Sequence, residues 1–168
     1  MAGADNMALF AQYVAVMGSV EDGIVECFRK GGGVPYEAFT RFHEMMVEDS
    51  GQSVLSSLES HILPLVPGLS ERFSTGIRVL DVGCGRGRVL NRLASLCHSS
   101  QFVGMDLSQD AIVHAREEGA RAGLENVQFV EADLSEFDRT AEPGSFDFVT
   151  AFDAIHDQAM SSGVFIGR

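Results

Sequence analysis

Cysteines and basic residues are scarce in this sequence, and long apolar runs are missing. Its 168 residues include three cysteines, Cys27, Cys84 and Cys97, with no CxxC motif and no histidine pair at ligand spacing nearby. This pattern excludes a disulfide framework and a zinc site, so we expect free thiols and no bound metal. Free thiols suit a reducing compartment, and because no segment marks an organelle we expect a cytoplasmic protein.

The scarcity of basic residues limits the possible partners. Lys and Arg number 12 against 24 Asp and Glu, which gives a formal net charge of −12. Binding that neutralises many phosphates would work against the protein's own field, so we expect no nucleic-acid partner.

The longest apolar run near the N-terminus is MALFAQYVAVMG, at residues 7–18. It is shorter than the roughly 18 residues of a membrane span. Asp5 precedes it, where a signal peptide would carry basic residues. We therefore expect neither a membrane span nor a signal peptide.

The first part of the chain has helical periodicity, and we interpret residues 1–75 as an N-terminal helical cap segment. Two stretches, residues 35–49 and 53–69, place apolar residues three or four positions apart, which predicts helices with a buried face. The apolar positions are Phe39, Phe42, Met45 and Met46 in the first stretch, and Leu55, Leu58, Ile62 and Leu65 in the second. Pro35 stands near the start of the first helix, where its missing N–H does no harm, and the surrounding GGGVPY indicates a turn. Pro64, Pro67 and Gly68 are expected to end the second helix.

From Gly76 onward, short β-rich runs alternate with helical ones. Strands are predicted at IRVLDV, QFVGMDL, NVQFVEADL and SFDFVTAFD, and helices at GRVLNRLASLC and SQDAIVHAREEGARAG. This alternation is typical of right-handed βαβ units, so we predict an α/β fold with a parallel sheet within residues 76–168. Ser108 is placed to cap the second of these helices, and Gly123 to end it.

An aspartate stands at or near the end of each predicted strand: Asp81, Asp106, Asp133 and Asp153. The carboxyl ends of parallel strands meet at one side of the sheet, which is where open α/β sheets bind ligands. Any one of these acids could be a turn residue or a helix cap. Four in register, with a glycine loop between the first two, indicate a ligand site.

The glycine loop lies in VLDVGCGRGRVL, where Gly83, Gly85 and Gly87 alternate with larger residues. Glycine tolerates a positive φ and lets the backbone approach a ligand closely, although a tight turn from strand to helix would also use it. A P-loop is excluded because Arg88 follows Gly87 where that motif has lysine.

The dinucleotide fingerprint GxGxxG needs a small residue at position 88, which is Arg, although Asp106 could supply its downstream acid. An NAD(P)-binding oxidoreductase domain therefore stays open as an alternative. Carboxylates beside the loop would repel a pyrophosphate, whereas they suit a ligand with an ammonium group, a ribose and an adenine.

The motifs VLDVGCGRG, GMDLS, EADLSEF and FDFVTAFDAIHD, in this order over residues 77–157, resemble those of class I S-adenosylmethionine-dependent methyltransferases. The resemblance implies S-adenosylmethionine as cofactor and a Rossmann-like parallel sheet in the order 3-2-1-4. It implies methyl transfer, and the acidic chain favours a small-molecule acceptor.

The resemblance also implies cofactor contacts. The predicted cofactor site consists of Asp81, Gly83, Cys84, Gly85, Gly87, Asp106, Leu107, Asp133, Leu134, Phe152 and Asp153. Asp81 and the glycines would hold the methionine moiety, and Asp106 would accept hydrogen bonds from both ribose hydroxyls. Leu107 would pack on the adenine, and Asp133 and Leu134 would contact it. Phe152 and Asp153 would lie near the methyl group.

His156 and Asp157 are the acid–base candidates beside this site. GGGVPYEAFTRFHE and FDAIHDQ further resemble a methyltransferase subgroup that carries a small winged-helix-like N-terminal domain, which we expect this chain to lack. This likeness implies that Tyr36, Phe39 and His43 line the substrate side. The alternative for Phe39 is an ordinary core aromatic.

Family members continue the sheet beyond the strands found here, so we expect a truncated domain. SFDFVTAF would then be an open edge, which invites a partner strand. Two interpretations follow: a methyltransferase that retains its cofactor half-site, or a non-catalytic truncated isoform that acts through a partner chain or is unstable.

Overall fold

The computed structural model describes residues 7–35, 38–134, 137 and 142–155. Contacts divide the chain into two compact units, Met1–Ser56 and Ser57–Arg168. The predicted domain boundary after residue 75 stays a prediction.

The described residues of the first unit form the α-helices α1 (Ala8–Gly18), α2 (Glu21–Lys30) and α3 (Phe42–Ser50), followed by the π-helical turn η2 (Gly51–Leu55). The expectation of a helix that starts near Pro35 was wrong. Arg41 adopts a left-handed conformation with φ 62°, which interrupts any helix from residue 35, so α3 begins only at Phe42.

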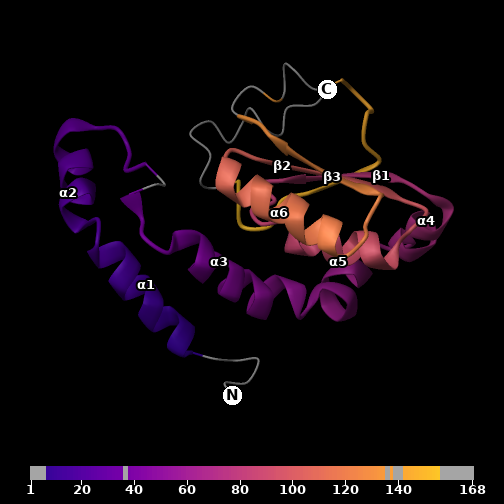
Figure 1. Ribbon diagram of the computed structural model, residues 1–168, viewed down its shortest axis with the longest axis horizontal. Coiled ribbons are helices and arrows are strands. Elements are labelled where there is room, and N and C mark those ends of the chain that lie inside the picture. The colour runs from indigo at the N-terminus through magenta and orange to yellow at the C-terminus, as the bar shows by residue number, and fades with distance from the viewer. Residues whose placement is uncertain (1–6, 36–37, 135–136, 138–141, 156–168) are drawn as a thin grey trace. The chain divides into compact units, whose positions relative to one another are not determined.

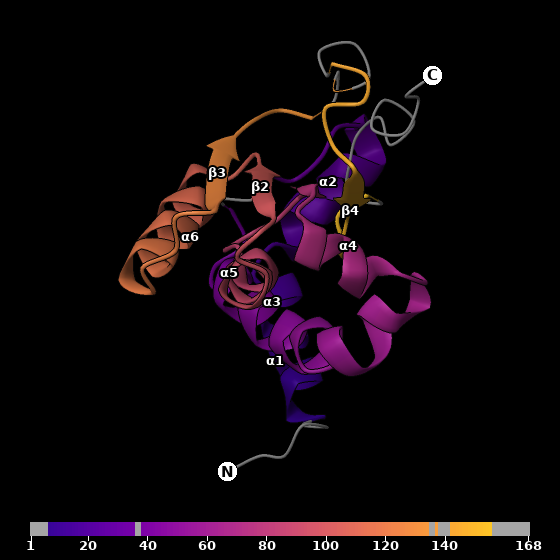
Figure 2. The same ribbon diagram turned by 90° about the vertical axis from the view of Figure 1, so that its right-hand side faces the viewer.

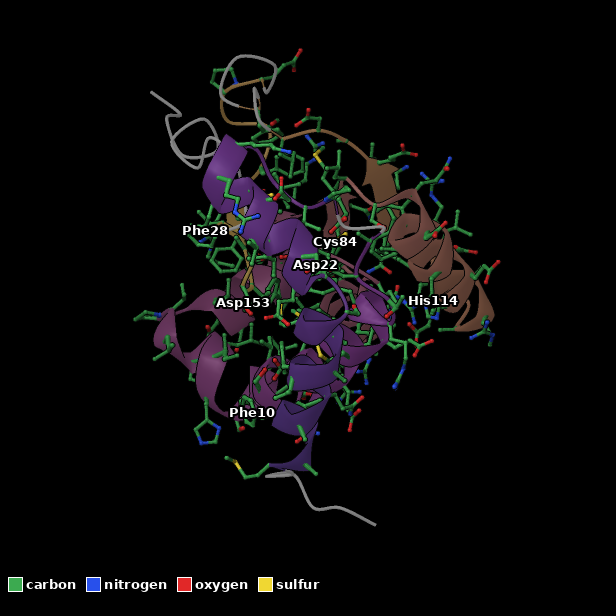
Figure 3. The ribbon with its side chains drawn as sticks, turned by 90° about the vertical axis from the view of Figure 1, so that its left-hand side faces the viewer. Phe10, Asp22, Phe28, Cys84, His114 and Asp153 are labelled. Atoms are coloured by element: carbon green, nitrogen blue, oxygen red, sulfur yellow. The ribbon has the colours of Figure 1, made fainter. Side chains whose placement is uncertain are left out.

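The buried face expected around Met45 is confirmed in this unit. Leu9 and Val16 of α1 pack with Met45, and the partly buried side chains around them are Tyr13, Phe39, Phe42 and Met46. Phe10 and Phe28 are exposed (Figure 3). Among the described residues, no single helix is long and apolar enough to cross a membrane; α1 and α2, bent by 59°, meet that criterion only as a pair.

The second unit begins with short helical turns, η3 (Leu58–Ile62) and η4 (Leu63–Leu65), and then α4 (Leu69–Thr75). The helix predicted from residue 53 to an end at Pro64, Pro67 and Gly68 is not continuous: the structure forms the separate turns η2, η3 and η4 there. Leu58 is fully buried, but Leu65 is 78% exposed, because the chain changes helix type at Pro64. Gly68, in a left-handed conformation, precedes α4.

The sheet of the second unit has four parallel strands in the order β3-β2-β1-β4, as predicted. The strands are β1 (Arg78–Val82), β2 (Gln101–Asp106), β3 (Val127–Glu131) and β4 (Phe148–Thr150). Figure 2 shows β3 and β4 toward opposite edges of this sheet. The connecting helices are α5 (Arg88–Leu96) and α6 (Gln109–Arg121), and the Ser108 hydroxyl accepts from the N–H of Ala111, as expected for the cap.

Helices cover one face of the sheet, as Figure 1 shows for α5 and α6. On this face Phe73 of α4 packs against Phe102 of β2 and Phe148 of β4. The opposite face buries Leu80 and Val82 under segments that follow β3 and β4, including Leu134. Buried faces on both sides fix the register, which brings the carboxyl ends of all four strands to one side.

Candidate functional site

The loop between β1 and α5 has the predicted glycine conformations. Gly83, Gly85 and Gly87 have φ angles of 70°, 52° and 68°, all left-handed. A Cβ on Gly87 would lie 2.4 Å from the Phe129 ring, and one on Gly83 would lie 2.3 Å from the Cβ of Ala154. A Cβ on Gly85 would meet no heavy atom within 4 Å. Two glycines are therefore required for packing, and the third borders open space.

Four backbone N–H groups of this loop are already engaged. Those of Gly83 and Cys84 donate to the carbonyl of Met105, at 2.8 and 3.1 Å, and that of Gly87 donates to the carbonyl of Cys84 at 2.9 Å. The N–H of Gly85 donates to Asp106 Oδ2 at 2.8 Å. A phosphate-binding loop directs such donors at its ligand, so this loop does not form a phosphate cradle.

Asp106 ends β2, and its carboxylate holds the loop by hydrogen bonds. Its Oδ2 accepts from Gly85, and its Oδ1 accepts from the N–H of Ser108 at 2.8 Å. A carboxylate offers about four lone-pair sites, so each oxygen keeps one acceptor position for a hydroxyl. The half-buried carboxylate can thus hold the loop and still accept from a ligand.

Asp81 lies on β1 and is only 3% exposed. Thr150 Oγ1 donates to its Oδ1 at 2.8 Å, and no other hydrogen bond reaches this carboxylate from the described part of the chain. Burial raises the pKa of Asp81 to about 7; the hydrogen bond from Thr150 opposes this shift, and the charge of Asp106 adds to it. The site therefore contains a carboxyl group that changes charge near neutral pH.

Cys84 lies in the loop after β1 (Figure 3), within electrostatic reach of both carboxylates. Burial raises the pKa of its thiol, and the charges of Asp81 and Asp106 raise it further. Its Sγ packs against β2, 2.8 Å from where a Cβ on Gly104 would lie. The thiol is therefore held protonated, and it forms no disulfide among the described residues.

The sequence of residues 73–166 matches the family model described as a methyltransferase domain. The chain belongs to the class I S-adenosylmethionine-dependent methyltransferases. The match does not favour the dinucleotide-binding alternative, in agreement with a loop whose N–H groups are engaged.

Two curated methyltransferases illustrate the likeness. A tRNA (guanine-N(7)-)-methyltransferase of Microcystis aeruginosa is 37% identical over 51 residues, which cover 30% of this chain and 24% of that protein. A ubiquinone biosynthesis O-methyltransferase of Albidiferax ferrireducens is 35% identical over 80 residues, which cover 48% of this chain and 31% of that protein. The matches thus span about a quarter to a third of these relatives.

Among solved structures, a SAM-dependent methyltransferase from Aquifex aeolicus aligns with a TM-score of 0.48 and 20% identity. The alignment covers 57% of this chain and 52% of that one.

The remaining predicted cofactor residues of the present chain follow β2, β3 and β4. Leu107, directly after β2, is 62% exposed. Asp133 is exposed, whereas the side chain of Leu134 is buried in the core. Phe152 is half-buried, and Asp153 (Figure 3) has a left-handed φ of 55°, uncommon for a residue with a side chain.

The predicted substrate and catalytic residues are only partly described. Tyr36, His156 and Asp157 lie outside the described residues, as does the side chain of His43. Phe39 packs on Phe42 in the first unit, with ring centroids 5.9 Å apart, as an ordinary core aromatic does.

Two surface hollows of the second unit, of about 470 and 410 Å³, contain no predicted site residue. The larger is lined by α6 and β3, and the smaller lies near the other ends of the strands. No group of three or more His, Cys, Asp or Glu side chains suited to a metal ion occurs within the described ranges. The carboxyl ends of the strands therefore remain the candidate site, because Asp81, Cys84 and Asp106 lie there.

Sequence reasoning missed Thr150, whose hydroxyl contacts the most buried acid of the site. Thr150 and Asp81 are direct partners in the register of β1 and β4. The alternation of β4 places Thr150 on the face opposite Val149, but no pattern indicates which residue of β1 stands beside it.

Proposed function

We propose that this chain binds S-adenosylmethionine at the carboxyl ends of β1 and β2 and transfers its methyl group to a small-molecule acceptor. The observation that carries the proposal is the buried Asp81 carboxyl, which has a single described hydrogen-bond donor and lies near Asp106. Buried carboxylates need compensation by donors or cations, and an ammonium group supplies both.

The residues present fit this cofactor. The site places two carboxylates and a protonated thiol around a loop that offers few backbone donors, so it disfavours phosphates and favours a cationic ligand. Open space over Gly85 leaves room for a ligand against the loop. Asp106 retains acceptor capacity for the paired hydroxyls of a ribose.

In this proposal Asp81, Gly83 and Gly85 hold the methionine end, and Asp106 orients the ribose. Leu107 offers an exposed apolar surface to the adenine, and Asp133 with the backbone of Leu134 contacts its edge. Phe152 and Asp153, after β4, border the methyl group.

When bound, S-adenosylmethionine supplies a methyl group on a positively charged sulfur, which leaves as a neutral thioether. The chain's own residues act by binding and alignment: Asp81 and Asp106 fix two separate parts of the ligand, which removes its freedom before reaction. The Cys84 thiol keeps its proton, so no thiolate competes with the acceptor. His156 and Asp157 are the proposed proton acceptors for the substrate.

A small-molecule acceptor is supported by charge and by relatives. A net charge of −12 opposes binding to a polyanion. Relatives include ubiquinone biosynthesis O-methyltransferases and an aklanonic acid methyltransferase of Streptomyces, 42% identical over 60 residues. The tRNA methyltransferase of Microcystis aeruginosa represents the competing acceptor class.

Calorimetric titration of S-adenosylmethionine into the monodisperse 168-residue chain tests the cofactor assignment. We expect saturable binding that Asp106→Asn weakens by roughly ten- to a hundredfold, because a charge-assisted contact to hydroxyls is lost. Glu117→Gln, an exposed acid on α6, is the matched control and should leave affinity unchanged. Absence of heat from a folded sample, or equal losses in both variants, would overturn the assignment.

A further inference from the structure

We propose that Thr150 is a positioning residue of the cofactor site: its hydroxyl fixes the orientation of the Asp81 carboxyl through the 2.8 Å hydrogen bond between β4 and β1. The inference rests on the proposed function, because it assigns to Asp81 the role of holding the ammonium group. It adds a residue of β4 that none of the predicted contacts includes.

Of the two register partners of Asp81, only Thr150 has a side chain. Asp81 pairs with Gly104 on β2 and with Thr150 on β4, and register partners in parallel strands leave the sheet on the same face. Gly104 has no side chain, and a Cβ there would lie within 3 Å of Phe129, Cys84 and Leu90. The β2 partner therefore supplies no side-chain donor, whereas the β4 partner does.

The Thr150 hydroxyl has two acceptors within reach. Its Oγ1 lies 2.8 Å from Asp81 Oδ1 and 3.3 Å from the carbonyl oxygen of Leu80. A hydroxyl carries one proton, and the shorter contact to an ionisable oxygen is the stronger. The β-branched side chain has few rotamers, so this bond also restricts the orientation of the carboxyl.

Apart from Thr150, the groups that act on Asp81 do not stabilise its ionised form. Asp106 faces it from β2 and Cys84 from the loop, and neither supplies positive charge. Thr150 is the one contributor that lowers the pKa of Asp81, against burial and the charge of Asp106. Loss of the hydroxyl therefore raises this pKa further above its usual range, so that less anion exists at neutral pH.

The experiment compares Thr150→Val, which removes the hydroxyl at nearly constant shape, with Thr150→Ser, which keeps it. Affinity for S-adenosylmethionine is measured by calorimetry from pH 6 to pH 9. We expect Thr150→Val to bind about tenfold more weakly at pH 7 and to regain most of the loss at pH 9. Thr150→Ser should bind S-adenosylmethionine with the same affinity and pH dependence as the original chain. Val149→Thr, on the same strand but the other face, is the control and should change nothing.

A shift in the pH midpoint of S-adenosylmethionine binding in Thr150→Val distinguishes a positioning role of Thr150 from a merely structural one. If Thr150→Val weakens binding equally at every pH, or if Thr150→Ser fails to rescue it, the inference is overturned. If Thr150→Val does not fold, as judged by circular dichroism, Thr150→Ala takes its place with the same expectations.

A ligand-free measurement separates this inference from the proposed function. The carboxyl carbon of Asp81, assigned in ¹³C NMR with Asp81→Asn, should titrate at higher pH in Thr150→Val than in the original chain. That shift without any cofactor binding would overturn the proposed function and the cofactor part of this inference, while retaining the control of Asp81 by Thr150. An unchanged titration would overturn that control, whatever the cofactor does.

Discussion

The carboxyl ends of β1 and β2 each carry an aspartate beside the same loop, but the two acids are held in opposite ways. Asp106 is half-buried and accepts from two backbone N–H groups, whereas Asp81 is buried and accepts from one hydroxyl. Backbone donors tie Asp106 to the shape of the loop. Asp81 contributes little to that shape, so its burial costs stability, and the proposed role in holding the cofactor gives a reason for it.

The difference teaches that two residues of the same type at equivalent strand ends can have separate tasks. Replacing Asp106 should harm both fold and binding, while replacing Asp81 should harm binding and improve the fold. Changes of opposite sign in the free energy of unfolding for the two replacements would support this comparison, and changes of the same sign would contradict it.

The largest expected effect concerns Asp81 and pH. Its folded pKa of about 7 lies above the ordinary value of 3.8, so between these values the folded chain binds more protons than the unfolded chain. The free energy of unfolding therefore falls as pH rises from 4 to 7, by on the order of 4 kcal/mol from this group. Asp81→Asn should remove that fall and be the more stable chain at pH 8.

Urea unfolding at several pH values measures this effect. Asp110→Asn, an exposed acid in the first turn of α6, is the control and should keep the pH dependence of the original chain. Parallel curves for Asp81→Asn and the original chain would show that Asp81 is not a destabilising buried acid.

A smaller effect of opposite sign is expected at Asp106. Asp106→Asn keeps one acceptor oxygen but replaces the other by a donor, so it loses one of the bonds from Gly85 and Ser108. We expect a loss of about 1–2 kcal/mol in the free energy of unfolding at pH 7. The same urea experiment measures it, and an unchanged midpoint would contradict the structural task assigned to this acid.

The smallest expected effect concerns the thiol between the two acids. Because Asp81 and then Asp106 raise the pKa of Cys84 beyond the effect of burial, Asp81→Asn should speed its alkylation by iodoacetamide at pH 8. The expected gain is about two- to fivefold, and it is smaller for Asp106→Asn. Mass spectrometry follows the reaction in a chain with Cys27→Ser and Cys97→Ser. Equal rates in all three chains would mean that the carboxylates do not control this thiol.

Sequence patterns predicted the second unit better than the first. The alternation of apolar runs predicted all four strands and their parallel arrangement, and the glycines predicted the left-handed turns. The first unit deviated at Arg41, where a left-handed residue starts α3 later than periodicity indicates. Nothing about an arginine favours that conformation, so tertiary contacts must select it.

The sequence by itself determined the local features of this protein: which segments form strands, where glycine permits positive φ, and that acids follow the strands. These follow from backbone sterics and from the periodicity of apolar residues, which act over a few positions. Only the tertiary structure decided that Thr150 stands against Asp81, 69 positions away, and that three N–H groups of the loop donate to Met105 and Asp106 of β2. Such pairings depend on the register between distant strands, which packing on both faces of the sheet selects.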